Sequence, residues 1–415
     1  MLIRRLNIAS EIFLYILLYG ITFSNAAVEG AVIFISIIFL IKLGLAAFNP
    51  KKDQFKLYLK TSINIFIGLL VLIIFISFLR NPHLKCSFRG FFRIIKYSVL
   101  FFALVDLFSH DTEKRTKRIF WGIIFIAGFT FLNGIFQNIF GFDILRQHTV
   151  NKLDYLERIN GSFVHANDFG AYIILVLPLT FIFFSRNFSK KNRIAALLIC
   201  LIGFYCILKT SSRGAWLGLI IGSIVYFIYY KKKFSLVIPL AMVLFITIFP
   251  TGLKRLLGIF SLHSGSALDR LKLWQGTWNM VKEHPILGFG INTYSQYFPF
   301  YKPADYPDLQ YSHNSYLQMW SEIGIIGLLI FLVLILAVIT LALRNIKNKI
   351  DSDKQGGQIL LGFTCGYIAF LIQALFDTNL YSLVLLTSFW FYSAYILCLN
   401  KYLENKCKNR KGLEK

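Results

Sequence analysis

Long apolar runs alternate with short basic stretches along almost the whole chain. Each run is long enough, or nearly so, to cross an apolar layer, which takes about 20 helical residues. The runs lie near residues 11–24, 26–48, 61–79, 91–108, 119–141, 169–185, 194–209, 214–230, 234–250, 324–343, 358–376 and 382–399. This pattern predicts an all-α fold, a polytopic membrane bundle of about twelve transmembrane helices.

One segment interrupts the alternation. About 70 residues between Pro250 and Gly324 mix aromatic, proline and charged residues, and this length exceeds that of ordinary connections between helices. We therefore expect four parts: the first nine transmembrane helices in residues 1–250, a loop with amphipathic helices in 251–323, the last three transmembrane helices in 324–399 and a basic tail in 400–415.

The long loop contains a helical pattern of its own. Ser266 and Asp269 have the spacing of a capping box, and Pro285 ends the periodic stretch. At about 100° per residue, one face of the predicted amphipathic helix carries Leu271, Trp274, Trp278 and Val281. Arg270 falls at the edge of this apolar face and should point inward, whereas Lys272 lies about 200° further round and should point away.

Charge sets the orientation of the predicted helices. The chain has 44 Lys and Arg against 20 Asp and Glu, and 27 of the basic residues fall in alternate loops and at the two termini. Basic residues in short loops stay on the cytoplasmic side, so we expect both termini inside and the long loop outside. The excess charge is spread over loop ends with no soluble basic domain to collect it, which argues against nucleic-acid binding.

Motifs for metals, nucleotides and disulfides are missing from the sequence. There is no HExxH, no Walker sequence, no paired cysteine motif and no Asp-x-Asp in the outer loops. The nearest acidic pairs, Asp154 with Glu157 and Asp305 with Asp308, are expected to be solvated loop charges. We therefore expect no metal and no cofactor, and the placing of the six cysteines does not indicate a disulfide framework.

Arginines on the outer face are the first candidates for chemistry. Arg213 lies beside a helix start, where the helix dipole disfavours cations and the positive-inside rule makes arginine least expected. It either snorkels at the helix end or faces an anionic ligand. Arg270 is either a solvated helix charge or a second cation at the same place. Two guanidinium groups suit a polyanion such as a lipid pyrophosphate, because their forks match phosphate oxygens. Arg158, in a glycine-containing outer loop, is open to a functional and to a structural interpretation.

His313 directly precedes the polar start of a helix in "YSHNSYLQMWSEIGIIG". It either makes a local hydrogen bond at the membrane interface or takes part in chemistry. The dipole at a helix N-terminus favours the neutral imidazole, which is the form that accepts a proton from a hydroxyl. His313 is therefore the candidate base. His165, in "FVHAND", is open to ligand contact or to loop packing.

These residues lie in stretches that resemble the O-antigen ligase and polymerase superfamily, and most of all its ligases. "HNSYLQMWSEIGIIG" is similar to the ligase signature of His, a polar residue, nine residues, Gly, two residues and a small residue, here His313, Asn314, Gly324 and Gly327. "TSSRGAW", "DRLKLWQGTWNMVKEHPILGFGINTY" and "RINGSFVHANDFGAY" resemble other segments of the superfamily. The resemblance runs from about residue 155 to about residue 345.

The resemblance implies a glycosyltransferase C-like bundle in the bacterial inner membrane, with an active site that faces the periplasm. Such ligases transfer O-antigen polysaccharide from undecaprenyl pyrophosphate to a sugar hydroxyl of the lipid A core, without metal or ATP. The expected partners are therefore the lipid-linked O-antigen, the lipid A-core acceptor and membrane lipids. By motif position, Arg213 and Arg270 would hold the pyrophosphate and His313 would activate the acceptor hydroxyl, with Arg158 and Asn314 as further substrate contacts.

Two alternative functions stay open. An O-antigen polymerase would use the same donor with a lipid-linked glycan as acceptor too, and the sequence separates it poorly from a ligase. A secondary transporter is another class of protein with many spans, but its site normally lies near the membrane midplane. Here the candidates gather at one face, and the buried-looking charges of Lys42, Arg93, Lys96 and Asp106 make no obvious relay.

Overall fold

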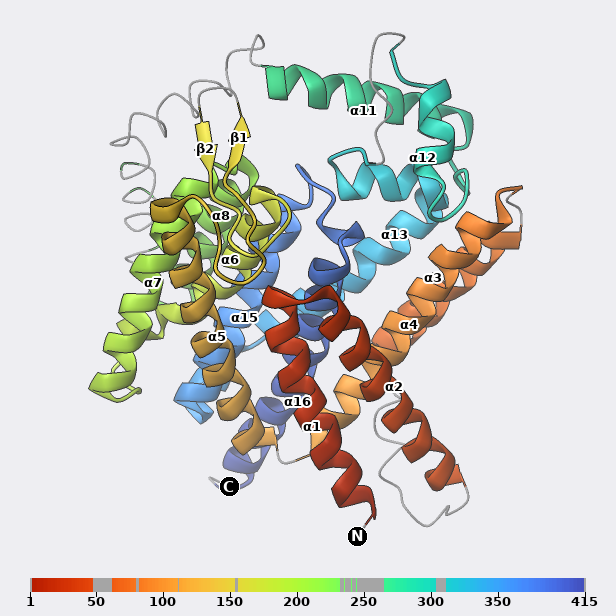
Figure 1. The fold of residues 1–415 in the computed structure, drawn as a ribbon. Helices are drawn as coiled ribbons and strands as arrows, with labels where there is room; N and C mark the ends of the chain where they lie inside the picture. The colour runs from red at the N-terminus through yellow and green to blue at the C-terminus, as the bar shows by residue number, and fades with distance from the viewer. Residues whose placement is uncertain are drawn as a thin grey trace.

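The computed structural model describes residues 2–47, 62–79, 82–110, 112–153, 156–231, 265–303 and 311–413, together with positions 235, 240 and 244. In this part of the chain, long helices form a bundle with a layer of shorter elements at one end (Figure 1). The long helices are α1 (Leu2–Phe23), α2 (Asn25–Ala47), α3 (Ser62–Leu79), α4 (Leu84–Ser109), α5 (Thr112–Phe140), α6 (Ala166–Thr180), α7 (Lys190–Thr210), α8 (Arg213–Tyr230), α13 (Ser315–Leu343), α15 (Lys354–Gln373) and α16 (Leu383–Leu413). The layer (Figure 1) contains the antiparallel strands β1 (Asn151–Leu153) and β2 (Leu156–Arg158), the helices α11 (Gly265–Glu283) and α12 (Tyr294–Tyr297), and the 3-10 helix η3 (Phe298–Phe300). Three further short elements follow long helices in the chain: η1 (Phe181–Phe184), α14 (Ile346–Ser352) and η4 (Asn379–Tyr381).

Nine helices of the described part are long and apolar enough to cross a membrane, so the chain is an all-α polytopic membrane protein, as predicted. They are α1, α2, α5, α6 with η1, α7, α8, α13, α15 and α16. α3 contains a shorter apolar helix, and α4 covers the run predicted at 91–108 but carries several charges. Almost all of the run predicted at 234–250 lies outside the described residues, as do Asp154, Asp305 and Asp308. The total of twelve helices, the glycosyltransferase C-like class and the four-part division stay predictions.

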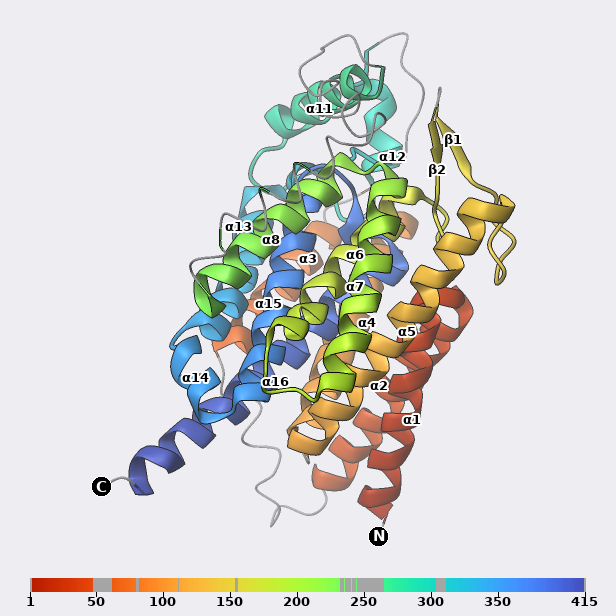
Figure 2. The ribbon, with the colours of Figure 1, turned by 90° about the vertical axis from the view of Figure 1, so that its left-hand side faces the viewer.

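Both chain termini lie at one end of the bundle, and α11, α12 and the β1–β2 hairpin lie at the opposite end (Figure 1, Figure 2). This arrangement agrees with the expectation that the termini share one side of the membrane and the long loop lies on the other. Which compartment each side faces stays a prediction.

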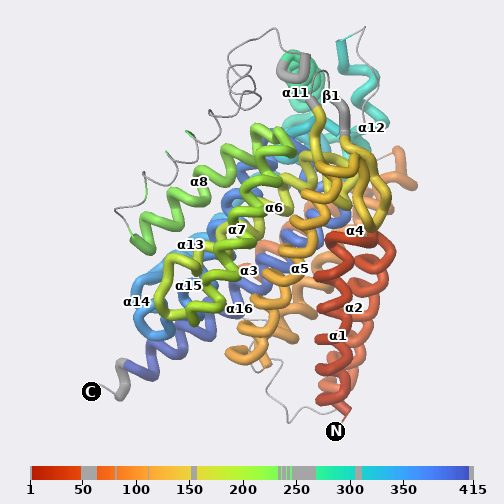
Figure 3. Tube along the Cα trace, turned by 60° about the vertical axis from the view of Figure 1, so that its left-hand side comes forward, coloured from red at the N-terminus to blue at the C-terminus, as the bar shows by residue number. Residues whose placement is uncertain are grey.

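The helices α15 and α16 form the centre of the bundle. In each of them 83% of the apolar stretch is buried, compared with 28% in α2 and in α7. Figure 3 shows these two helices between α8 on one side and α1 and α2 on the other. A small residue brings α8 close to α15, because a Cβ at Gly218 would lie 2.4 Å from the carbonyl oxygen of Ala369. The first residue of α8, Arg213, is thereby held near the outer end of α15.

Charged side chains inside the N-terminal helices are paired. Lys42 of α2 donates a hydrogen bond to Asp106 of α4. Lys96 of α4 donates to both carboxylate oxygens of Glu29 in α2, at 2.7 and 2.8 Å. Such pairing offsets the cost of placing charges within a lipid layer. These two pairs therefore bind α2 to α4 at different depths.

The outer layer is attached to α13 at one crossing. Backbone hydrogen bonds of 2.8 to 2.9 Å join residues 285–290 to residues 321–325. At this point α13 is kinked, because Gly324 has φ 69° and ψ −179°. A Cβ there would lie 2.0 Å from the carbonyl oxygen of Ile286, so only glycine fits the crossing. The helix predicted to begin at residue 324 therefore begins at Ser315 and bends at Gly324.

The helix α11 is amphipathic, but the predicted apolar face was partly wrong. Its buried side chains include Leu273, Thr277, Met280 and Val281. Leu271 and Trp278, which were expected to face inward, are exposed. The reason is that the chain after α11 folds back against the helix: Thr277 shares a hydrogen bond of 2.8 Å with the hydroxyl of Tyr294. The buried face is thus the one that residues 294–301 cover.

Candidate active site at the start of α13

The start of α13 carries the candidate base and is fastened to the turn after α15. Asn314 caps the helix, since its Oδ1 accepts hydrogen bonds of 3.0 and 3.1 Å from two backbone N–H groups of the first turn. Ser315 donates from its N–H and its Oγ to the carbonyl oxygen of Asp377, at 3.1 and 2.8 Å. His313, just before the cap, has a positive φ of 51°. Asn314 therefore has a structural task, and its contact with substrate stays a prediction.

His313 forms a pair with Asp377. Its Nδ1 lies 3.1 Å from Oδ1 of the carboxylate. The imidazole is 42% exposed and the carboxylate 11%. Because an ionised carboxylate only accepts hydrogen bonds, Nδ1 carries the proton in this pair. The other ring nitrogen, Nε2, is then the one that can accept a proton from a hydroxyl.

The pKa of Asp377 is lowered. Burial by itself raises this pKa, but four favourable interactions outweigh it: the hydrogen bond from His313, the charge of His313, the charge of Arg270 and the backbone N–H of Thr378. The last of these is a hydrogen bond of 2.8 Å. The carboxylate therefore stays ionised, and Arg270 acts on the same group as His313. His313 and Arg270 thus both act on one carboxylate, and their role in a shared site stays a prediction.

Arg270 lies on α11, which covers the outer end of the bundle (Figure 1). It is partly buried, whereas Lys272, two residues further on, is exposed. The predicted contrast between the two cations is thereby confirmed. The positive charge of Arg270 contributes to the lowered pKa of Asp377, so it acts toward the turn after α15.

Arg213, the first residue of α8, lies beside the same outer turn. A Cβ at its neighbour Gly214 would lie 3.2 Å from Cβ of Phe376 and 3.4 Å from Cγ of Gln373. Phe376 directly precedes Asp377 in the chain. The turn after α15 is therefore the place to which the starts of α8 and α13 and the charge of Arg270 all converge.

Arg158, the last residue of β2, is held by the protein itself. Its Nε donates to the carbonyl oxygen of Thr210 and its Nη2 to Oδ1 of Asn167, both at 2.7 Å. Asn167 in turn accepts a hydrogen bond of 3.0 Å from Gln373 of α15 through its carbonyl oxygen. Arg158 thus ties the β1–β2 hairpin to the helix ends around the site, and its role in substrate binding stays a prediction.

Two acidic residues of this region were not among the candidates from the sequence. Asp377 lies in "ALFDTNLYS", between the last two predicted spans. The sequence feature that could have indicated Asp377 is a carboxylate in a short turn between two predicted spans, in a chain with only 20 acidic residues. Asp168, in the first turn of α6, interacts electrostatically with Asp377 and His313. It lies within a stretch that was singled out for its resemblance but not for this residue.

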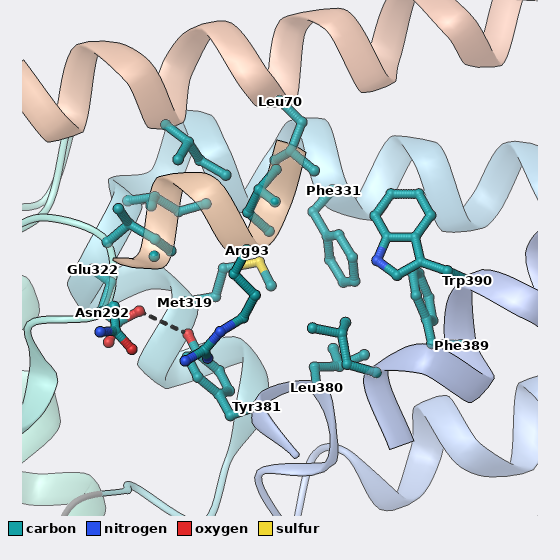
Figure 4. Close-up of a pocket in the computed structure, with 16 residues that line it drawn as sticks. Leu70, Arg93, Asn292, Met319, Glu322, Phe331, Leu380, Tyr381, Phe389 and Trp390 are labelled. Atoms are coloured by element: carbon teal, nitrogen blue, oxygen red, sulfur yellow. Dashed lines mark hydrogen bonds between the residues drawn. The ribbon is translucent and has the colours of Figure 1, made fainter. Parts of the chain in front are cut away.

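A buried carboxylate further along α13 holds the layers together. Oε1 of Glu322 accepts from the N–H of Tyr294, and Oε2 accepts from the hydroxyl of Tyr381, both at 3.2 Å. Figure 4 shows Glu322 and Tyr381 near Arg93, next to a cavity of about 60 Å³ with a mostly apolar lining. Glu322 therefore fastens the outer layer and η4 to the helix that begins at the candidate base.

Known proteins with similar sequences carry related descriptions. A family model described as O-Antigen ligase matches residues 198–332. The ComP-specific O-oligosaccharyltransferase of Acinetobacter baylyi is 26% identical over 306 residues, which are 70% of this chain and 53% of that protein. The O-antigen ligase of Salmonella typhimurium is 26% identical over 332 residues, 75% of this chain and 78% of that protein. A putative polysaccharide ligase of Rickettsia conorii is 25% identical over 298 residues, 66% of each chain. The chain thus spans about half the length of the first of these relatives.

The region matched by the family model runs from α7 into α13. It contains Arg213, Arg270 and His313, which are three of the residues gathered around the turn after α15. The predicted resemblance is confirmed: this part of the chain is similar to the O-antigen ligase family.

Proposed function

We propose that this chain is an O-antigen ligase, which transfers O-antigen polysaccharide from undecaprenyl pyrophosphate to a sugar hydroxyl of the lipid A core. Its site would face the periplasm from the bacterial inner membrane. The observation that carries the proposal is the pair of His313 and Asp377, with Arg270 acting on the same carboxylate. Similarity to the ligase family supports a membrane glycosyltransferase, and the identity of the donor and of the acceptor is our addition.

In this proposal His313 acts as the base. Its Nε2 takes the proton of the acceptor hydroxyl, while Asp377 keeps the proton on Nδ1 and stabilises the imidazolium that forms. The acceptor oxygen then attacks the anomeric carbon of the first sugar of the donor. A positioned base of this kind contributes about 10²- to 10⁴-fold to a rate.

The bond that breaks joins that anomeric carbon to an oxygen of the pyrophosphate. Negative charge develops on the leaving undecaprenyl pyrophosphate. Arg213 and Arg270 would bind this group, because guanidinium forks match phosphate oxygens and a low-dielectric membrane edge strengthens each contact. We assign the stabilisation of this charge to the two arginines, without a metal.

Deleting the gene tests the proposal. The deletion strain should lose the ladder of long lipopolysaccharide on a gel and accumulate lipid-linked polymer. A plasmid with His313→Ala should not restore the ladder, whereas one with Lys272→Ala, a change at an exposed cation, should restore it. A core that carries a single O-unit would indicate a polymerase instead. Solute uptake into liposomes without any sugar transfer would indicate a transporter.

A further inference from the structure

A second cavity lies in the outer layer, at the opposite end of α11 from Arg270. Its volume is about 350 Å³, which falls in the range of small-molecule sites. Its lining includes Glu283, His284, Phe289, Tyr297, Phe300 and Tyr301. Ser77 of α3 and Pro82, just before α4, complete one side. The cavity therefore lies where the outer layer meets the α3–α4 hairpin.

Aromatic rings make up much of the wall of this cavity. The ring of Phe289 lies 4.6 Å from that of Tyr297 and 5.5 Å from that of Tyr301, measured between centroids. Phe300 is 81% exposed, although its neighbour Phe298 is fully buried. An exposed ring next to packed rings offers a flat apolar face to a ligand.

Polar groups stand at the edge of these rings. The hydroxyl of Tyr301 donates a hydrogen bond of 2.5 Å to Oε2 of Glu283. Burial, together with Glu283, raises the pKa of Tyr301 to about 12, so the phenol stays protonated. Nε2 of His284 lies 3.8 Å from Oε1 of Glu283, and its ring meets Phe289 edge-on at 4.5 Å. The cavity thus offers a carboxylate, a phenol and an imidazole beside apolar faces.

A sugar ring fits this combination of groups. Its C–H faces pack on aromatic rings, while the hydroxyls around its edge donate to the carboxylate or to the phenol oxygen and accept from an imidazole N–H. The carboxylate of Glu283 repels phosphate, which therefore suits this cavity less than it suits the arginines around Asp377. An acyl chain would satisfy none of the remaining hydrogen-bonding capacity of the carboxylate and the imidazole.

We propose that the cavity of Glu283, Phe300 and Tyr301 binds a sugar ring of the glycolipid acceptor. This inference rests on the proposed function and adds a place for the acceptor. Residue Phe289 of the cavity donates its N–H to Ser321, six residues along α13 from Ser315, or about 9 Å at 1.5 Å per residue. The cavity therefore lies beside the helix that begins next to the base.

Two features of the surroundings agree with this assignment: the distance of the cavity from Arg270, which we assign to the donor, and the apolar surface of α3. Arg270 precedes Glu283 by thirteen residues on α11, or about 20 Å, so the cavity lies well away from the cation assigned to the donor. The α3 helix exposes Ile65, Leu72 and Leu79, each more than half exposed. An acceptor held in the membrane by its acyl chains can lie along α3 and reach the cavity with its sugars.

The variant Phe300→Ala tests the proposal in purified protein with lipid-linked donor and glycolipid acceptor. Removing one stacked ring should raise the KM for the acceptor about two- to tenfold and leave the KM for the donor and kcat unchanged. Phe140→Ala, at an exposed phenylalanine at the end of α5, is the matched control and should leave all three constants unchanged. Glu283→Gln should also raise the acceptor KM. A rise in the donor KM alone, or no rise in either constant, would overturn the assignment.

Binding without transfer separates this inference from the proposed function. The probe is the core oligosaccharide freed from lipid A by mild acid, and its contact with the protein is measured by saturation-transfer NMR. Binding to the unchanged protein and to Phe140→Ala, with about two- to tenfold weaker binding to Phe300→Ala, supports the cavity even if the enzyme transfers nothing in the assay. Equal binding by all three proteins, or no binding by any of them, contradicts it.

Discussion

Replacing Asp377 by asparagine tests the central pair of the site most directly. The side chain keeps nearly the same volume, and its oxygen can still accept the hydrogen bond from Thr378. The same oxygen, Oδ1, also contacts Nδ1 of His313, so asparagine keeps the hydrogen bond to the imidazole but carries no negative charge. The imidazolium that forms when Nε2 takes the proton of the acceptor then loses its charged partner. Asp377→Asn is therefore expected to weaken base catalysis strongly with little change in shape.

The size of the effect follows from what the pair contributes. A positioned base contributes about 10²- to 10⁴-fold, and each tenfold corresponds to about 1.4 kcal/mol of activation free energy. Complete loss of the base would thus cost about 3 to 6 kcal/mol, which is the upper limit for a variant that removes only the charge of its partner. Because the carboxylate acts through the imidazole, the loss should appear in kcat, and the KM for the donor should change little.

The assay is transfer by the purified protein, with donor concentration varied at saturating acceptor. The matched control is Asp353→Asn, at the start of α15 on the opposite side of the bundle, because its carboxylate is 12% exposed against 11% for Asp377. The control should retain the parent kcat. A kcat of Asp377→Asn within roughly threefold of the parent would refute the reasoning, since a base contributes at least about a hundredfold. A similar loss in the control would mean that buried carboxylates serve stability alone.

Three further predictions concern charge, backbone and pH. Arg270→Lys should lower kcat/KM for the donor about tenfold or more in the transfer assay, because lysine lacks the guanidinium fork. The control Lys272→Ala should retain the parent value. If Arg270→Lys has the same kcat/KM as the parent, the arginine does not belong to the site. Gly324→Ala should lower the melting temperature, because a positive φ costs about 1 to 2 kcal/mol and the new Cβ would overlap backbone atoms. Gly30→Ala should not lower it, because no atom lies within 4 Å of a Cβ at that position. Intrinsic fluorescence measured during heating compares the two variants. The pKa of Asp377 is lowered on folding, so its stabilisation is present above the unfolded pKa and is lost as pH falls through the lower folded value. The melting temperature of Asp377→Asn should therefore fall below that of the parent at about pH 7 and approach it near about pH 3, and a constant difference would contradict this assignment.

The helical bundle could be predicted because hydropathy acts locally. A span needs about 20 apolar residues in a row, so each run in the sequence reports on its own helix. Charge adds the sidedness of loops, again from local composition. Kinks within a helix are harder to predict from the sequence. The crossing at Gly324 depends on a segment some 35 residues earlier in the chain, and the sequence around it still reads as a helix start.

The residues of the candidate site could be predicted only where a polar residue is unusual for its local sequence. His313 and Arg213 are polar residues at helix starts, and a local pattern is enough to notice them. Asp377 acquires its role from a contact across 64 residues, which no local pattern contains. Asn314 shows the limit of a local pattern, because a place just before a helix indicates a cap at least as well as a ligand contact.

The signature around His313 combines two different physical requirements. The imidazole needs a carboxylate partner, which the turn after α15 supplies. The glycine eleven residues later needs a positive φ and open space, because the chain after α11 crosses α13 there. Trp320 strengthens the same junction by donating from Nε1 to the carbonyl oxygen of Pro285, at 3.0 Å. The crossing thus fixes α11, and with it Arg270, relative to the helix of the base. In the proposed function, Gly324 would therefore act by positioning rather than by chemistry, and the spacing between histidine and glycine is the length of helix that lies between the proposed base and the crossing.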